Sequence, residues 1–309
     1  MNQSIFFKEI KYICLIILTI LLCGCSKKHE AYVSTSTEPR DNTPRCLVPE
    51  APGTNVDEDE FITLDYSNVS EGYIMFTYHG DSENIKMQIT GPDYMTYTYD
   101  IHDNSTEAFP ISAGNGSYTI AAYELVEGNT YSTLSSYVHD FTVTDQMGAF
   151  LYPNQYVKFT PDSNVVKAAV DIVAPAHDDL EAINCVYNYL IDNVTYDLEK
   201  AENVQSGYIP DVDEILEIKT GICLDYAAVM TSMLRSQGIP TRMEVGYAGS
   251  AYHAWISTYA ENIGWINGMV EFDGTSWSIM DPTVAANSGE EALKSFIGDG
   301  GSYLTKYIY

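Results

Sequence analysis

Three reactive side chains, the thiol of Cys223, the imidazole of His253 and the carboxylate of Asp281, lie far apart in the chain. Cys223 and His253 are 30 positions apart, and His253 and Asp281 are 28 positions apart. At these spacings each group can lie on its own helix or strand, so the three groups come together only when the chain folds. A thiol beside an imidazole that a carboxylate orients is an activated nucleophile. The triple therefore predicts a C-terminal domain in which three separate elements converge.

Residues 61–146 are expected to form a small antiparallel β-sandwich. Short apolar runs alternate with polar residues here, and Gly91-Pro92-Asp93 and Asn115-Gly116 stand between them. Alternation with a period of two predicts half-buried strands, and the glycine-containing segments predict tight turns. Several such strands in succession indicate a sandwich of Ig-like character.

The residue pattern changes after Met147, where apolar residues begin to recur at helical spacing. We expect a second domain over 147–309. Its predicted elements are helices over 165–172, 178–193 and 223–238, a short helical turn ending near Thr220-Gly221, and strands over Arg242–Tyr247, Tyr252–Tyr259 and Trp277–Met280. The helix that begins at Cys223 has its stop signals at Gly238 and Pro240. The fold class is therefore α+β, with helices first and an antiparallel sheet after them.

The first 24 residues have the pattern of a secretory signal peptide. Lys8 and Lys11 precede an apolar run over 12–22 that is short for a membrane span. The ending Leu22-Cys23-Gly24-Cys25 resembles a bacterial lipobox, which predicts removal of residues 1–24 and lipidation of Cys25. We then expect a lipid anchor at the extracytoplasmic face of a bacterial cell membrane. Ordinary secretion with cleavage nearby is the alternative.

Residues 25–60 are expected to form a flexible stalk. The segment is polar, contains four prolines from Pro39 onward and ends in Asp57-Glu58-Asp59-Glu60. Such a composition buries too little apolar surface to fold by itself. The stalk would hold the two domains away from the membrane.

The chain is strongly acidic, with a formal net charge of −28. Removal of the signal peptide, which carries two lysines and one glutamate, would change this to −29. A negative field repels the phosphate backbone, so nucleic acid is not an expected partner. The charge favours cationic partners or serves solubility.

Six cysteines occur in the chain, and processing would remove or lipidate three of them. Cys46, Cys185 and Cys223 then remain. Three thiols are too few for a disulfide scaffold, although a bridge between Cys46 and Cys185 stays open. Cys185 lies opposite the apolar stripe of its helix and is interpreted as a packing or surface thiol.

Cys223 is the expected nucleophile because a helix N-terminus and an imidazolium neighbour both favour a thiolate. His253 would take or hold the thiol proton and return it to the leaving amine. Asp281 would accept from the other ring nitrogen and fix the tautomer. The backbone N–H of Cys223 is the natural first donor to an oxyanion.

Several nearby residues are candidates for supporting roles. The second oxyanion donor is open among Tyr208, Tyr196, Asn193 and Gln205. Trp255 shares a strand face with His253 and is expected to be a packing wall, while Asp225 is expected to cap the helix or to support the site from behind.

From about Val165 to Thr283 the chain resembles the transglutaminase-like superfamily, whose core is similar to that of papain-type cysteine peptidases. The matching pieces are Tyr196-Asp197, Tyr208-Ile209-Pro210, Thr220-Gly221-Ile222-Cys223-Leu224-Asp225-Tyr226-Ala227, Gly238-Ile239-Pro240-Thr241-Arg242, Gly246-Tyr247, His253-Ala254-Trp255, Trp277 and Asp281-Pro282-Thr283. The resemblance implies Cys223 as nucleophile, His253 as base and Asp281 as orienter, acting by acyl transfer through a thioester. The segment from Ile263 to Phe272 is longer than the hairpin usual in bacterial members. No calcium-loop spacing is present, so we expect no metal and no cofactor.

Together these features predict a cell-surface thiol enzyme that acts on protein or peptide amides. If an amine accepts the acyl group, the reaction is crosslinking. If water accepts it, the enzyme is a cysteine peptidase or amidase, which is the alternative. A non-catalytic surface binding module with a vestigial triad is a second alternative, and the complete set of three residues counts against it.

The lipobox predicts that Cys25→Ser releases the protein from the membrane fraction or leaves its precursor uncleaved, because no thiol remains to take the lipid. Fractionation and the mass of the N-terminal peptide measure both effects. A variant that is processed and membrane-bound like the wild type would contradict the prediction.

Overall fold

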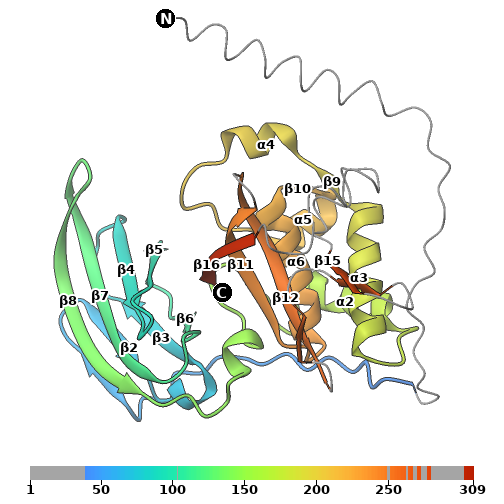
Figure 1. Ribbon diagram of the computed structural model, residues 1–309. Coiled ribbons are helices and arrows are strands. Elements are labelled where there is room, and N and C mark those ends of the chain that lie inside the picture. The colour runs from blue at the N-terminus through green and yellow to red at the C-terminus, as the bar shows by residue number, and fades with distance from the viewer. Residues whose placement is uncertain are drawn as a thin grey trace, which may run out of the picture. The chain divides into compact units, whose positions relative to one another are not determined.

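The computed structural model describes residues 39–102, 104–248, 251–261, 264–266, 270–272, 277–279 and 303–309 (Figure 1). The predicted signal peptide, Cys25 and Asp281 lie outside these residues. Within the described part of the chain, no helix is both long and apolar enough to cross a membrane.

The N-terminal half consists of two four-stranded antiparallel sheets. One contains, in spatial order, β1 (Val56–Glu58), β2 (Ile62–Asp65), β3 (Tyr73–Tyr78) and β6 (Glu107–Pro110), and the other β5 (Thr96–Ile101), β4 (Ile85–Thr90), β7 (Gly116–Glu127) and β8 (Thr130–Phe141). Burial alternates along β4, as the period of two predicts. The ring of Tyr99 in one sheet lies 4.7 Å from that of Phe109 in the other, so the sheets share a core. The Ig-like class stays a prediction.

The C-terminal half contains helices followed by strands, as expected. The helices are α2 (Asn164–Val173), α3 (Asp179–Asn193), α4 (Leu198–Asn203), α5 (Val212–Ile218) and α6 (Cys223–Ser236). A four-stranded antiparallel sheet has the order β13 (Gly264–Ile266), β12 (Ala251–Ala260), β11 (Thr241–Ala248) and β16 (Tyr303–Ile308). Two short pairs complete it, β9 (Thr195–Tyr196) with β10 (Thr220–Gly221) and β14 (Val270–Phe272) with β15 (Trp277–Ile279). The predicted helices and strands are confirmed, whereas α4 and β16 were not predicted.

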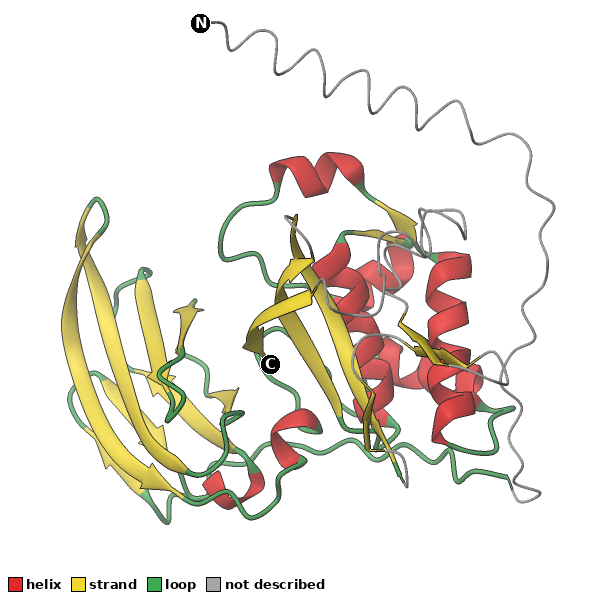
Figure 2. Cartoon of the chain, viewed as in Figure 1, coloured by secondary structure: helices red, strands yellow, loops and turns green. Residues whose placement is uncertain are grey.

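Helix α6 lies at the centre of this half. It contacts α2, α3 and α5 as well as β11 and β12 (Figure 2). Every residue from Asp225 to Ser236 is buried, as expected for a helix that is covered on all sides. The helix ends where Gly238 adopts a φ of +73°, a left-handed conformation that glycine adopts without strain.

Arg235, in the last turn of α6, is fully buried. Its Nε and Nη2 donate to the carbonyl oxygen of Thr241, Nη2 donates also to that of Tyr309, and Nη1 donates to that of Tyr152. Burial lowers the pKa of Arg235, while the carbonyl dipoles stabilise the charged form. One side chain thus joins α6 to β11, to the residue after β16 and to the connection that follows the N-terminal sheets.

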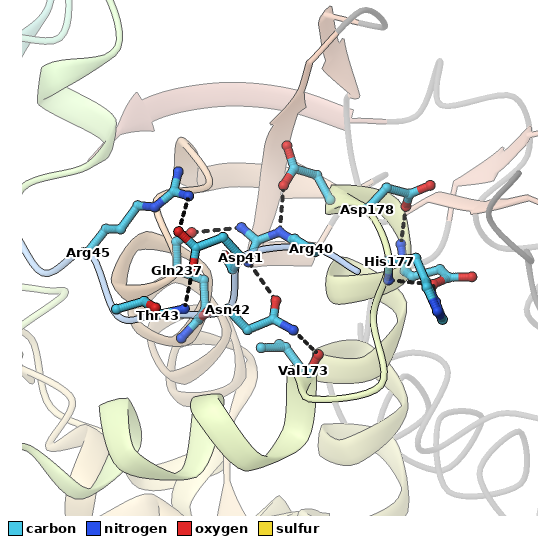
Figure 3. A network of polar contacts seen from close by, with 11 residues as sticks. Arg40, Asp41, Asn42, Thr43, Arg45, Val173, His177, Asp178 and Gln237 are labelled. Atoms are coloured by element: carbon cyan, nitrogen blue, oxygen red, sulfur yellow. Dashed lines mark hydrogen bonds and ion pairs between the residues drawn. The ribbon is translucent and has the colours of Figure 1, made fainter. Parts of the chain in front are cut away.

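Residues 39–60, the second part of the predicted stalk, are hydrogen-bonded to other parts of the chain. Arg40 bonds the carboxylate of Asp179 at 2.8 Å and the carbonyl of Gln237 at 2.7 Å, and Asn42 donates to the carbonyl of Val173 (Figure 3). The N–H of Arg45 donates to Ser236, and β1 is part of a sheet. Over 39–60 the expected flexibility is therefore wrong, because these bonds satisfy carbonyls at the ends of α2 and α6. Residues 25–38 lie outside the described part.

The buried core continues across the predicted boundary at Met147. The ring of Tyr309 contacts those of Tyr97 and Tyr99 from the N-terminal half and that of Tyr156. By their contacts, the described residues belong to one compact unit. Independent folding of the two halves stays a prediction.

Arg235→Leu should lower the free energy of unfolding by at least about 3 kcal/mol, because buried carbonyl oxygens lose their donors. Urea unfolding measures the change. Arg45→Leu is the matched control, because that side chain is 55% exposed and paired only at the surface, and it should change stability by less than about 1 kcal/mol. Equal effects of the two substitutions would show that the Arg235 contacts contribute little.

Candidate active site

Cys223 is the first residue of α6 and is partly exposed. The first N–H groups of a helix lack intrahelical partners, and their dipoles favour a negative charge beside them. The predicted helix start at the cysteine is therefore confirmed. The other two described cysteines, Cys46 and Cys185, are also free thiols, so no bridge joins them. Burial raises the pKa of both, and the charge of Glu181 adds to the effect at Cys185.

The bonds of Arg235 place the start of α6 beside the start of β12. Arg235 bonds the carbonyl of Thr241, which pairs with Thr258 in β12. From Arg235 to Cys223, twelve residues earlier in α6, the length along the helix is about 18 Å. From Thr258 to His253, five residues earlier in β12, the length along the strand is about 17 Å. Because α6 contacts β12, these lengths put Cys223 and His253 at about the same level.

The electrostatics of Tyr252 agree with this placement. Burial raises the pKa of Tyr252, and the charges of Tyr307, Tyr247 and Cys223 raise it further. A thiol that acts on the phenol of Tyr252 lies near the residue that precedes His253. The structure thus brings the helix start and the imidazole-bearing end of β12 into one region.

The strand around His253 has a buried aromatic neighbour. Trp255 is 3% exposed, and its ring centroid lies 6.4 Å from that of His253 and 4.8 Å from that of Tyr303. Alternation along a strand puts His253 and Trp255 on the same face. The expectation that Trp255 is a wall beside the imidazole fits this packing. Asp281, the predicted orienter, lies outside the described residues.

Asp225 is completely buried two residues after Cys223. Its carboxylate accepts from the N–H of Ile222 at 2.8 Å, from the hydroxyl of Tyr208 at 2.7 Å and from Nζ of Lys200 at 2.6 Å. A Cβ on Gly221 would lie 2.7 Å from that of Asp225, so this close approach requires glycine. Asp225 therefore caps α6 and also fastens the segment around α4 to the helix start. Sequence reasoning missed Lys200, because no local pattern connects it with Asp225.

Tyr208 differs from its predicted role. Its hydroxyl donates to Asp225 and accepts from Lys200, and its pKa is raised by burial and by the neighbouring carboxylate. A phenol has a single proton, so this arrangement leaves none for an oxyanion. Asn193 and Gln205 donate to main-chain oxygens of Tyr189 and Asn203. The second oxyanion donor is thus not assigned.

Comparison with known proteins gives a family for this region. Residues 166–268 match the sequence profile of the Transglutaminase-like superfamily. A protein of Bacillus subtilis strain 168, named YebA and described as uncharacterized, is 26% identical over 140 residues, which are 38% of this chain and 19% of that protein. A protein-glutamine gamma-glutamyltransferase of Pseudomonas aeruginosa is 27% identical over 108 residues, which are 30% of this chain and 14% of that enzyme. The matched stretches thus span less than a fifth of these relatives.

Among solved structures, the periplasmic domain of TgpA from Pseudomonas aeruginosa bound to ethylmercury is 15% identical and has a TM-score of 0.33. The alignment covers 77% of this chain and 78% of that one. The family match begins in α2, ends just after β13 and includes both Cys223 and His253. Residues 166–268 of this chain form a transglutaminase-like domain.

Proposed function

We propose that the protein is a thiol enzyme that forms a thioester on Cys223 from an amide of a protein or peptide. The observation that supports this most is the position of Cys223, at the N-terminus of α6 and level with His253 of β12, inside a transglutaminase-like domain. His253 acts as the base, and Asp281 orients its ring.

Each step of the proposed reaction has a group to perform it. The sulfur of Cys223 attacks the amide carbon, and the resulting oxyanion accepts from the N–H of Cys223. The C–N bond then breaks, and His253 gives its proton to the departing amine or ammonia. The thioester that remains is attacked by a second nucleophile, whose proton returns to His253. Free Cys223 is restored when the C–S bond breaks.

The acyl acceptor decides between crosslinking and hydrolysis. An amine acceptor is favoured by the relative named protein-glutamine gamma-glutamyltransferase and by the net charge of −28, which attracts cationic amines. Water as acceptor would make the protein a cysteine peptidase or amidase. A binding module without catalysis is the remaining alternative, and the free, partly exposed thiol of Cys223 counts against it.

The proposed location is the outer face of a bacterial cell membrane, with the lipid on Cys25 as anchor. This proposal rests on the lipobox alone. Substrates would then be proteins or peptides at the cell surface.

Iodoacetamide at pH 6 should alkylate Cys223 faster than Cys46 and Cys185, because burial raises the pKa of the latter two thiols and leaves them protonated. Peptide mass spectrometry of the full chain over time measures the three rates. His253→Ala should slow the alkylation of Cys223 by about tenfold or more and leave Cys46 and Cys185 unchanged.

Cys185→Ser is the control, since it should not alter labelling of Cys223. Equal rates for Cys185 and Cys223 at pH 6 would remove the chemical support for the proposed nucleophile.

If amines are the acceptors, incorporation of a diamine into a glutamine-bearing protein should fall as salt rises, while hydrolysis of a neutral amide changes little. The reason is that salt screens the attraction between the acidic chain and a cation over about 10 Å at 0.1 M. Mass spectrometry of the products in one salt series measures both reactions. Hydrolysis alone, with no amine adduct at any salt concentration, would contradict crosslinking and favour the peptidase or amidase.

A further inference from the structure

The guanidinium of Arg242, in β11, lies against two aromatic rings that are nearly perpendicular to each other. Its central carbon lies 3.7 Å from the ring centroid of Trp265 and 4.7 Å from that of Phe150. These cation–π contacts stabilise the charge of the guanidinium. The group has five N–H donors, and the two rings offer them no oxygen acceptor.

The side chain of Arg242 has no polar partner among the residues that the structure describes. The other three arginines, Arg40, Arg45 and Arg235, bond carboxylate or carbonyl oxygens. The Nε of Arg242 is buried without an acceptor in this part of the chain. A buried donor without a partner is unusual and indicates that a water, ion or ligand supplies one.

Glu244, whose charge acts on Arg242, does not meet this need. The carboxylate of Glu244 accepts hydrogen bonds from the hydroxyls of Ser257 and Thr305. Burial lowers the pKa of Arg242, and Glu244 only partly opposes this. An anion placed on the free edge of the guanidinium would offset the cost of burying its charge.

Arg242 borders a cavity of about 320 Å³. This volume lies at the lower end of the range for small-molecule sites, about 300–1,000 Å³. The cavity is lined by the rings of Phe150 and Trp265, which meet edge to face, and by Ile111, Ala113, Val143, Met147 and Ala149. The polar residues Ser112 and Gln146 and the backbone of Gly114 also line it. Among the described residues that line the cavity, Arg242 is the charged one, although the chain carries a net charge of −28.

We propose that this cavity binds a small organic molecule through a carboxylate, which the N–H edge of Arg242 holds while the apolar walls receive the carbon skeleton. The planar fork of arginine matches the two oxygens of a carboxylate. One guanidinium without a second cation suits a single negative charge better than a multiply charged anion.

The cavity is separate from the thiol of Cys223. Ligand binding there would be a property beyond the proposed function. Arg242 pairs with Ser257, four residues after His253 along β12, which corresponds to about 13 Å of strand. Ligand binding can therefore be tested whether or not Cys223 is a nucleophile.

Phenylacetate and phenylacetamide are matched probes, because they have nearly the same shape and differ in charge. Calorimetric titration of the full chain, together with tryptophan fluorescence, should show binding of phenylacetate and at least tenfold weaker binding of the amide. Inorganic phosphate should bind at least tenfold more weakly than phenylacetate, since it has no carbon skeleton. Absence of phenylacetate binding at 10 mM, or equal binding of phosphate, would overturn the proposal.

Arg242→Gln should weaken phenylacetate binding by roughly 10- to 100-fold, because charged hydrogen bonds are lost. Arg242→Lys should fall between this variant and the wild type. Arg45→Gln removes the same charge from the surface and is the matched control, with unchanged affinity expected. Ala113→Met keeps Arg242 but fills the cavity, and it should also abolish binding. Wild-type affinity in both the Arg242→Gln and Ala113→Met variants would contradict the assignment.

Discussion

Helix α6 is buried, and side-chain hydrogen bonds hold both of its ends in place. At the C-terminal end, Arg235 bonds three main-chain carbonyls that belong to separate parts of the chain. At the N-terminal end, Asp225 bonds the backbone of Ile222 and the side chains of Tyr208 and Lys200. Because both ends of α6 are held, the position of its first residue, Cys223, is fixed as well.

The buried charges at the two ends of α6 are compensated by different kinds of partner. Asp225 has a cationic partner in Lys200, so its carboxylate is compensated despite full burial. Arg235 has carbonyl dipoles instead of a carboxylate. Removing one member of a compensated buried pair typically costs 3–5 kcal/mol, because the other charge is left behind. Substitution of Lys200 or Asp225 would therefore disturb the helix start on which the proposed chemistry depends.

Local signals in the sequence were sufficient to predict the central elements of the domain. Gly238 and Pro240 predicted where α6 ends, and α6, β11 and β12 lie where a helix from Cys223 and two strands were expected. The contact of Lys200 with Asp225 could not be predicted, because it joins residues 25 positions apart. Strand β16 was missed for a similar reason: Leu304 is 63% exposed, and the strand pairs with β11, about 60 residues earlier.

The predicted stalk shows how composition can mislead. Residues 39–60 contain prolines and charges and no apolar stripe, yet Arg40 and Asn42 satisfy carbonyls at helix ends. Such bonds depend on where other elements end, which composition does not encode. The proposed triad could be inferred from the sequence only through its residue types and spacings. Its described members lie on adjacent elements, and the second oxyanion donor was not found, because the phenol proton of Tyr208 is used by Asp225.

The most direct test of the proposed chemistry is capture of the acyl-enzyme. The full chain is mixed with a glutamine-bearing peptide, quenched in acid and analysed by peptide mass spectrometry. The account predicts a thioester at Cys223 with the mass of the peptide less ammonia, which is lost on treatment with hydroxylamine. Cys223→Ala should carry no adduct, and Cys185→Ser should carry it as the wild type does. No adduct on Cys223 with any glutamine or amide substrate, or an adduct that persists in Cys223→Ala, would contradict the account.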